Sequence, residues 1–253
     1  MQTAKKAVGI GVMDADKIKS DAIAMWIELS DRIFEEGGEI EGLNYLKKVY
    51  KLDKSFVPTV TRLCDYYSRK NNNAKVVSIV SKSWALNQHP DLAKIWKKLA
   101  PILGDKNKKK YLKWFERLLA IEPKNDLALI MAAEAAVQVE DWSKAIGYID
   151  TAEESHPSSE LYRLKAIVQK NSHVDDGTDI SASVRHMIER VADTQLEKCW
   201  ICSETGRVYE RWDAIAKPHN AFNTIIWDYP QAFRMKENYL SQSNLRVAND
   251  FGF

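Results

Sequence analysis

Hydrophobic residues recur at every third or fourth position over most of residues 20–157, which is the spacing of an amphipathic α-helix. Short polar breaks at 37–38, 71–73, 104–107 and 140–141 separate these apolar segments. The clearest case is the segment 127–137, followed across a polar break by 142–152. The pattern therefore predicts a succession of paired helices.

The predicted pairs return at a constant interval. Pro123 and Pro157 each follow the end of a pair and lie 34 residues apart, which is the period of the tetratricopeptide repeat. Counting back from Pro157, small residues fall where this repeat packs its helices closely, at Ala133, Ala136, Ala145 and Ala152. Further steps place earlier unit ends near Gln88 and Lys54, so about four units are expected over 20–157. One unit cannot bury its apolar face alone, and stacking of neighbours supplies the core.

The predicted fold class is all-α, a tetratricopeptide-repeat α-solenoid with a small degenerate zinc-ribbon-like β element at its C-terminal end. Composition supports the helical part of this prediction. Only 10 Gly and 7 Pro occur in 253 residues, too few for a turn-rich β protein. With 37 Lys+Arg against 35 Asp+Glu, the net charge is 37 − 35 = +2, which argues against a nucleic-acid partner. The longest uninterrupted apolar run, 127–133, is far shorter than a membrane helix, so the chain as given is expected to span no bilayer.

We expect four regions along the chain. The repeat solenoid occupies 1–170, and a loop with a capping helix at 181–192 occupies 171–198. The ribbon-like segment follows at 199–229, and 230–253 is expected to be a flexible tail.

The ribbon-like segment carries the candidate metal ligands Cys199, Cys202 and His219. Two thiolates at Cys-x-x-Cys spacing can share one tetrahedral metal ion, but Ala216 stands where a further ligand is expected. Three interpretations stay open. The ribbon has lost its metal and is held by its aromatic residues, it retains zinc through partial or borrowed ligands, or the thiols have a redox role. No cofactor is expected, and zinc is the one that this segment could still hold.

The sequence contains no catalytic constellation, and we expect no enzyme activity. Gly9 and Gly11 are not followed by the strand-helix-strand pattern of a dinucleotide site. Histidines such as His89 lack partners at ligand spacing and are interpreted as loop or surface residues. The lysines between 106 and 113 are interpreted as a solvated turn, with contact to anionic lipid or an acidic partner as the alternative.

A tetratricopeptide solenoid presents the first helix of each pair on its concave side, where partners bind. The side chains predicted to point into this groove include Asp31, Phe34, Asp65, Arg69, Trp96 and Glu134. Arg69 and Trp96 are the predicted anchors, because Arg and Trp side chains dominate binding energy at interfaces.

Several phrases together resemble one family. They are Ser-Trp-Ala-Leu-Asn-Gln-His-Pro-Asp-Leu-Ala at 83–93, Ala-Ala-Glu-Ala-Ala-Val-Gln-Val-Glu-Asp-Trp at 132–142, and Asn-Ala-Phe-Asn-Thr-Ile-Ile-Trp at 220–227. With the Cys199-x-x-Cys202 pair between the last two, they resemble the C-terminal soluble region of the bacterial HemY family. Family ribbons carry Cys-x-x-Cys-Gly twice, and this chain departs with Ser203 after the first pair and with Ala216 and His219 in the second.

The resemblance implies a non-enzymatic scaffold or regulator in late haem or porphyrin biosynthesis, whose partners are enzymes of that pathway. It also implies a soluble domain on the cytoplasmic side of the bacterial inner membrane, anchored by N-terminal membrane helices that this sequence does not contain. Two alternatives remain. One is an adaptor in another envelope pathway such as lipopolysaccharide assembly, and the other is a direct haem carrier that uses His219 or Cys199 as axial ligand.

Overall fold

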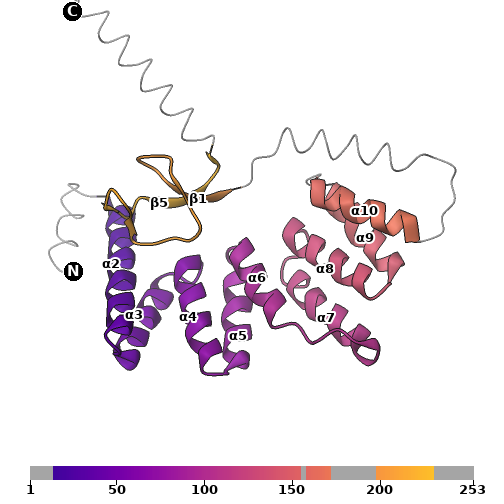
Figure 1. Ribbon diagram of the computed structural model, residues 1–253, viewed down its shortest axis with the longest axis horizontal. Coiled ribbons are helices and arrows are strands. Elements are labelled where there is room, and N and C mark those ends of the chain that lie inside the picture. Colours follow the sequence, from indigo (N-terminus) through magenta and orange to yellow (C-terminus); the bar gives the residue numbers. More distant parts are fainter. Residues whose placement is uncertain (1–13, 155–157, 172–197, 231–253) are drawn as a thin grey trace, which may run out of the picture. The chain divides into compact units, whose positions relative to one another are not determined.

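The computed structural model describes residues 14–154, 158–171 and 198–230 (Figure 1). The predicted capping helix at 181–192, and all of the predicted tail beyond Pro230, lie outside these residues. The chain divides into two compact units. We call Asp53–Gln195 the repeat module, and we call Met1–Leu52 together with Leu196–Phe253 the ribbon module.

The repeat module is built from paired α-helices. The pairs are α4 (Val57–Arg69) with α5 (Asn73–Trp84), α6 (Pro90–Lys98) with α7 (Lys108–Leu119), and α8 (Asp126–Gln138) with α9 (Trp142–Glu153), followed by α10 (Ser159–Asn171). A short 3-10 helix, η1 (Asp105–Asn107), precedes α7. The first helices begin at 57, 90, 126 and 159, so the intervals of 33, 36 and 33 bracket the predicted period of 34. The all-α fold class of tetratricopeptide type is confirmed.

Two of the polar breaks in the sequence, 71–73 and 140–141, contain helix caps. Asn72 accepts a hydrogen bond from the backbone N–H of Lys75 at 3.1 Å, and Asp141 accepts one from Lys144 at 3.2 Å. In each case the side chain satisfies a backbone donor that the first turn of a helix leaves without a partner. Just before these caps, Asn71 and Glu140 adopt positive φ, which turns the chain between the two helices of a pair.

Small side chains allow the helices to approach closely in the pair α8 and α9. Helix α8 contacts α7, α9 and α10, and it is apolar on more than one face. The four alanines predicted at close-packing positions, Ala133, Ala136, Ala145 and Ala152, are fully buried. The sequence prediction is confirmed here, because a larger side chain at these positions would hold neighbouring helices apart.

The ribbon module joins residues from both ends of the sequence. It contains the hairpin of α2 (Ala15–Glu35) and α3 (Glu39–Leu52), and a small β element. Strands β2 (Val208–Tyr209), β1 (Cys199–Cys202) and β5 (Ile225–Asp228) form an antiparallel sheet in that order. Strands β3 (Ile215–Ala216) and β4 (Ala221–Phe222) form a separate hairpin. The β element therefore lies where the sequence predicts it.

A direct contact ties the β element to α2. The Asn223 amide Nδ2 donates to Asp21 Oδ1 at 2.7 Å and to Ser20 Oγ at 2.9 Å. The partners are more than 200 residues apart in sequence. No helix within the described ranges combines the length and the apolar character needed to cross a bilayer.

Candidate functional site

The first helices of successive pairs form a row in the repeat module. Helix α4 contacts α6, α6 contacts α8, and α8 contacts α10. We call α4, α6, α8 and α10 the helix row. This is the arrangement in which tetratricopeptide-type proteins expose one side chain set from every pair to a bound segment.

Charged side chains connect adjacent helices of the row. Lys97 Nζ on α6 lies 2.5 Å from Glu134 Oε2 on α8. Glu160 on α10 is next to Glu134. Its pKa is raised, mainly because the carboxyl group is partly buried and secondly because Glu134 is negatively charged. Arg163 Nη2 lies 4.0 Å from Glu160 Oε1. We call Lys97, Glu134, Glu160 and Arg163 the charged ladder. It contains the predicted groove residue Glu134.

Two further predicted groove residues lie at the other end of the row. Asp65 and Arg69 are exposed on α4 and are four positions apart, so they share one face of that helix. The structure leaves both side chains accessible, as a partner-binding role requires.

Trp96, in contrast, belongs to the core. Its side chain has 0% exposure, and its ring stacks on Trp114 of α7 with centroids 4.6 Å apart. Each indole Nε1 donates to the backbone carbonyl of the other tryptophan, both at 3.1 Å. Trp96 therefore fastens α6 to α7 and is not an exposed anchor. No local pattern indicates this contact, because the partner is 18 residues away in the chain.

The remaining predicted groove residues, Asp31 and Phe34, are half-buried on α2 of the ribbon module. Phe34 packs over Gly42 of α3, where an added Cβ would lie 3.1 Å from the ring. Ser30 reinforces this approach by donating to the Gly42 carbonyl at 2.8 Å. Phe34 thus helps to close the α2–α3 hairpin.

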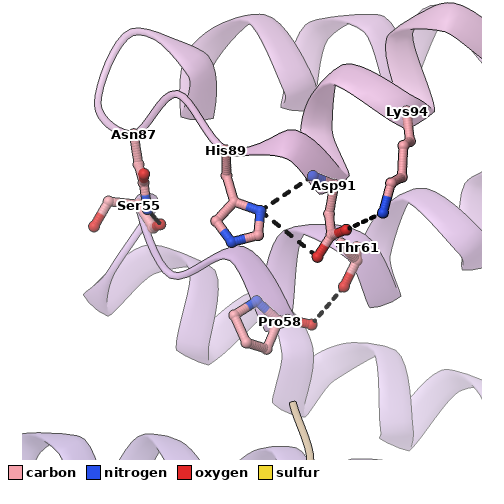
Figure 2. Close-up of polar contacts among 7 residues, drawn as sticks. All are labelled: Ser55, Pro58, Thr61, Asn87, His89, Asp91 and Lys94. Carbon is pink, nitrogen blue, oxygen red and sulfur yellow. Dashed lines mark hydrogen bonds and ion pairs between the residues drawn. The ribbon is translucent and has the colours of Figure 1, made fainter. Parts of the chain in front are cut away.

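The 83–93 phrase builds the start of α6 (Figure 2). His89 is the N-cap residue, and its Nδ1 accepts from the backbone N–H of Asp91 at 3.1 Å. Nearby, the Asn87 amide donates to the Ser55 carbonyl at 3.0 Å, which ties this loop to the residues before α4. His89 lies in a loop as expected, but it is buried and not on the surface.

Burial also changes the protonation of His89. Desolvation is the largest influence and lowers the pKa of His89 to about 4, although the carboxylate of Asp91 opposes it. The imidazole is therefore neutral at neutral pH, which leaves Nδ1 able to accept the capping hydrogen bond.

In the ribbon, the structure brings together two of the three predicted metal ligands. Cys202 Sγ lies 3.4 Å from His219 Nε2 and 3.4 Å from Thr224 Oγ1. Burial alone would raise the pKa of Cys202, but hydrogen bonds from Thr205, Thr224 and the backbone N–H groups of Glu204 and Thr205 outweigh it and lower the pKa to about 6. Cys202 is fully buried.

Cys199 is directed elsewhere. Both cysteines lie within β1, where Cys199 pairs with Asp228 and Cys202 with Ile225. Residues three apart in a strand point to opposite faces of a sheet, so β1 does not present the two thiols to one ion. The Cys-x-x-Cys spacing is typical of a metal-binding turn, but here both cysteines belong to a strand.

The two turns of the ribbon do not lie between Cys199 and Cys202. They follow Cys202 and Ala216. The first runs from Cys202, whose carbonyl accepts from Gly206 N–H at 2.8 Å, and Gly206 has φ +70°. The second follows Ala216, and its Asn220 has φ +56°. Residues at matching places in the two turns are Cys202, Thr205, Ala216 and His219.

This set does not fit a tetrahedral zinc site. Four donors are required, and Cys202 and His219 supply two. Ala216 is a fully buried methyl group that supplies none, and a neutral Thr205 hydroxyl is not among the usual zinc ligands. Within residues 14–154, 158–171 and 198–230, no three His, Cys, Asp or Glu side chains are grouped to hold a metal ion.

Comparison with known proteins finds likeness in three-dimensional structure only. No family model matches the sequence, and no curated protein matches it. Among solved structures, YrrB, described as a TPR protein with an unusual peptide-binding site, is 12% identical with a TM-score of 0.40, covering 71% of this chain and 91% of its own.

Two further solved structures are similar to the same extent. A tetratricopeptide repeat protein from Parabacteroides merdae is 16% identical with a TM-score of 0.40, covering 68% of each chain. The MamA RS-1 ArsTM double mutant is 18% identical with a TM-score of 0.39, covering 69% of this chain and 97% of its own.

Proposed function

We propose that the chain is a non-enzymatic scaffold that binds a segment of a partner protein along the helix row. The observation that carries this proposal is the set of accessible charges on consecutive first helices, from Asp65 and Arg69 on α4 to the charged ladder on α6, α8 and α10. Because the row carries charges of both signs at separate places, it favours a partner whose own charges lie in the complementary order. The total charge of the partner matters less.

The proposed pathway is late haem or porphyrin biosynthesis, at the cytoplasmic side of the bacterial inner membrane. Its support is the resemblance of residues 83–93, 132–142 and 220–227 to the HemY family. The partners are then enzymes of that pathway. The ribbon requires no zinc in this proposal, since its turn positions lack two of the four donors.

The test is direct binding of purified haem-pathway enzymes to the chain, measured by surface plasmon resonance. We expect the double variant Arg69→Glu, Lys97→Glu to bind at least about tenfold more weakly, because it reverses charge at two places on the row. The matched control is Lys47→Glu, which reverses an exposed charge on α3. Equal affinity of the double variant and the control would contradict the proposed site.

The same material separates the alternatives. Binding to lipopolysaccharide-assembly proteins but not to haem-pathway enzymes would favour the envelope adaptor. A Soret band on titration with haemin, lost in His219→Ala, would favour the haem carrier. The proposed scaffold predicts neither result.

A further inference from the structure

The connection between α6 and α7 carries an unusual apolar tip. Ile102 is 89% exposed and Leu103 is 38% exposed. A Cβ added at Gly104 would meet no atom within 4 Å, so the tip projects from the repeat module and is not folded against it. Leaving an isoleucine side chain almost wholly in water forgoes the free energy that its burial would provide.

Positive charge surrounds this tip within a few residues. Lys98 ends α6, Lys106 lies in η1, and Lys109 and Lys110 lie in the first turn of α7. All four are exposed, and within the described part of the chain none of them forms an ion pair. Between 98 and 110 the sequence has one acidic residue, Asp105. Lys108 is neutralised by Glu140, with Nζ 2.8 Å from Oε2.

We propose that the 98–110 segment docks on an anionic lipid surface. Ile102 and Leu103 enter the boundary between headgroups and acyl chains, and the four lysines contact lipid phosphates. Neither signal alone holds a protein at a bilayer, but apolar insertion and electrostatic attraction add in free energy when they act at one place.

The apolar tip distinguishes lipid from an acidic protein surface. Lysines alone would suit either partner, since both present negative charge. An almost fully exposed isoleucine between the lysines matches the layered chemistry of a bilayer, in which phosphate lies directly above hydrocarbon. This inference is independent of the helix row and of its partner.

The experiment is co-sedimentation of the full chain with vesicles of phosphatidylcholine, with and without phosphatidylglycerol. We expect binding to the anionic vesicles, decreasing as salt rises. We expect about tenfold weaker binding for Ile102→Ser with Leu103→Ser, and a similar loss for Lys106→Gln with Lys109→Gln and Lys110→Gln. All five side chains are exposed, so these variants keep the packing of the core.

Matched controls come from α3, where Ile40 is 79% exposed and Lys47 is exposed. Ile40→Ser and Lys47→Gln are expected to bind anionic vesicles like the parent chain. Three outcomes overturn the proposal: no binding to anionic vesicles, equal loss in the control variants, or loss with the lysine variant but not with the Ile102 and Leu103 variant. The last outcome indicates adsorption to the vesicles by charge alone, without insertion of Ile102 and Leu103.

Discussion

At the scale of single residues, burial decides what each side chain can do. His89 and Trp96 both belong to residue types that are common at functional sites, yet both are enclosed. His89 caps a helix, and Trp96 exchanges hydrogen bonds with Trp114. Cys202 has a lowered pKa, but its thiol is enclosed by the ribbon.

The buried His89 predicts that stability depends on pH. Its folded pKa of about 4 lies below the ordinary value of 6.5, so the unfolded chain binds a proton that the folded chain does not. The free energy of unfolding should therefore decrease as pH falls from about 6.5 to about 4, by up to about 3 kcal/mol. Urea unfolding at several pH values measures it.

The variant His89→Asn isolates this effect. Asparagine accepts the same capping hydrogen bond but does not titrate. We expect its unfolding free energy to lose the His89 part of the decrease between pH 6.5 and 4. An unchanged pH profile in the variant would assign the dependence to other groups.

At the scale of elements, the ribbon combines two similar turns with side chains of unlike chemistry. Gly206 and Asn220 provide the positive φ angles of two matching turns. The matching positions of the two turns, Cys202, Thr205, Ala216 and His219, hold a thiol, a hydroxyl, a methyl group and an imidazole. Trp200 and Trp227, with ring centroids 5.0 Å apart, and the buried Trp212 supply apolar packing in this element.

We therefore expect the ribbon to be folded without zinc. Elemental analysis should give a zinc-to-protein ratio far below one, and the near-ultraviolet circular dichroism of the tryptophans should not change with a strong chelator. The control is the same measurement after addition of excess zinc. A ratio near one, or loss of the signal with chelator, would show that the ribbon borrows ligands for a metal.

At the scale of the whole molecule, the chain order and the spatial grouping differ. The ribbon follows the repeats in sequence, but it forms one compact unit with the first helical hairpin. Asn223, with φ +55°, makes the side-chain contacts to Ser20 and Asp21 that join them.

This grouping predicts that a substitution in the ribbon lowers the local stability of α2. Asn223→Gly keeps the positive φ but removes both hydrogen bonds, so we expect about 1–3 kcal/mol lower local stability. Amide hydrogen exchange should become faster in α2 and stay unchanged in α8 and α9. Exchange that rises equally in both modules, or in neither, would contradict the grouping.

Much of the fold could be predicted because its determinants are local. Helical periodicity, the polar caps Asn72 and Asp141, and the buried alanines of α8 and α9 are all visible within one repeat. The groove was predicted less completely. Asp65, Arg69 and Glu134 lie on the helix row, whereas Trp96 turns inward because Trp114 offers it a stacking partner.

The sequence by itself determined the helical pairs and their period, since these follow from hydrophobic spacing and capping chemistry between near neighbours. It also indicated the place of the β element, through the spacing of Cys199 and Cys202. Only the tertiary structure decided that Cys199 and Cys202 face apart, that His89 is enclosed, and that the ribbon joins the first hairpin. These outcomes depend on strand pairing and on contacts between residues far apart in the chain, which no local pattern encodes.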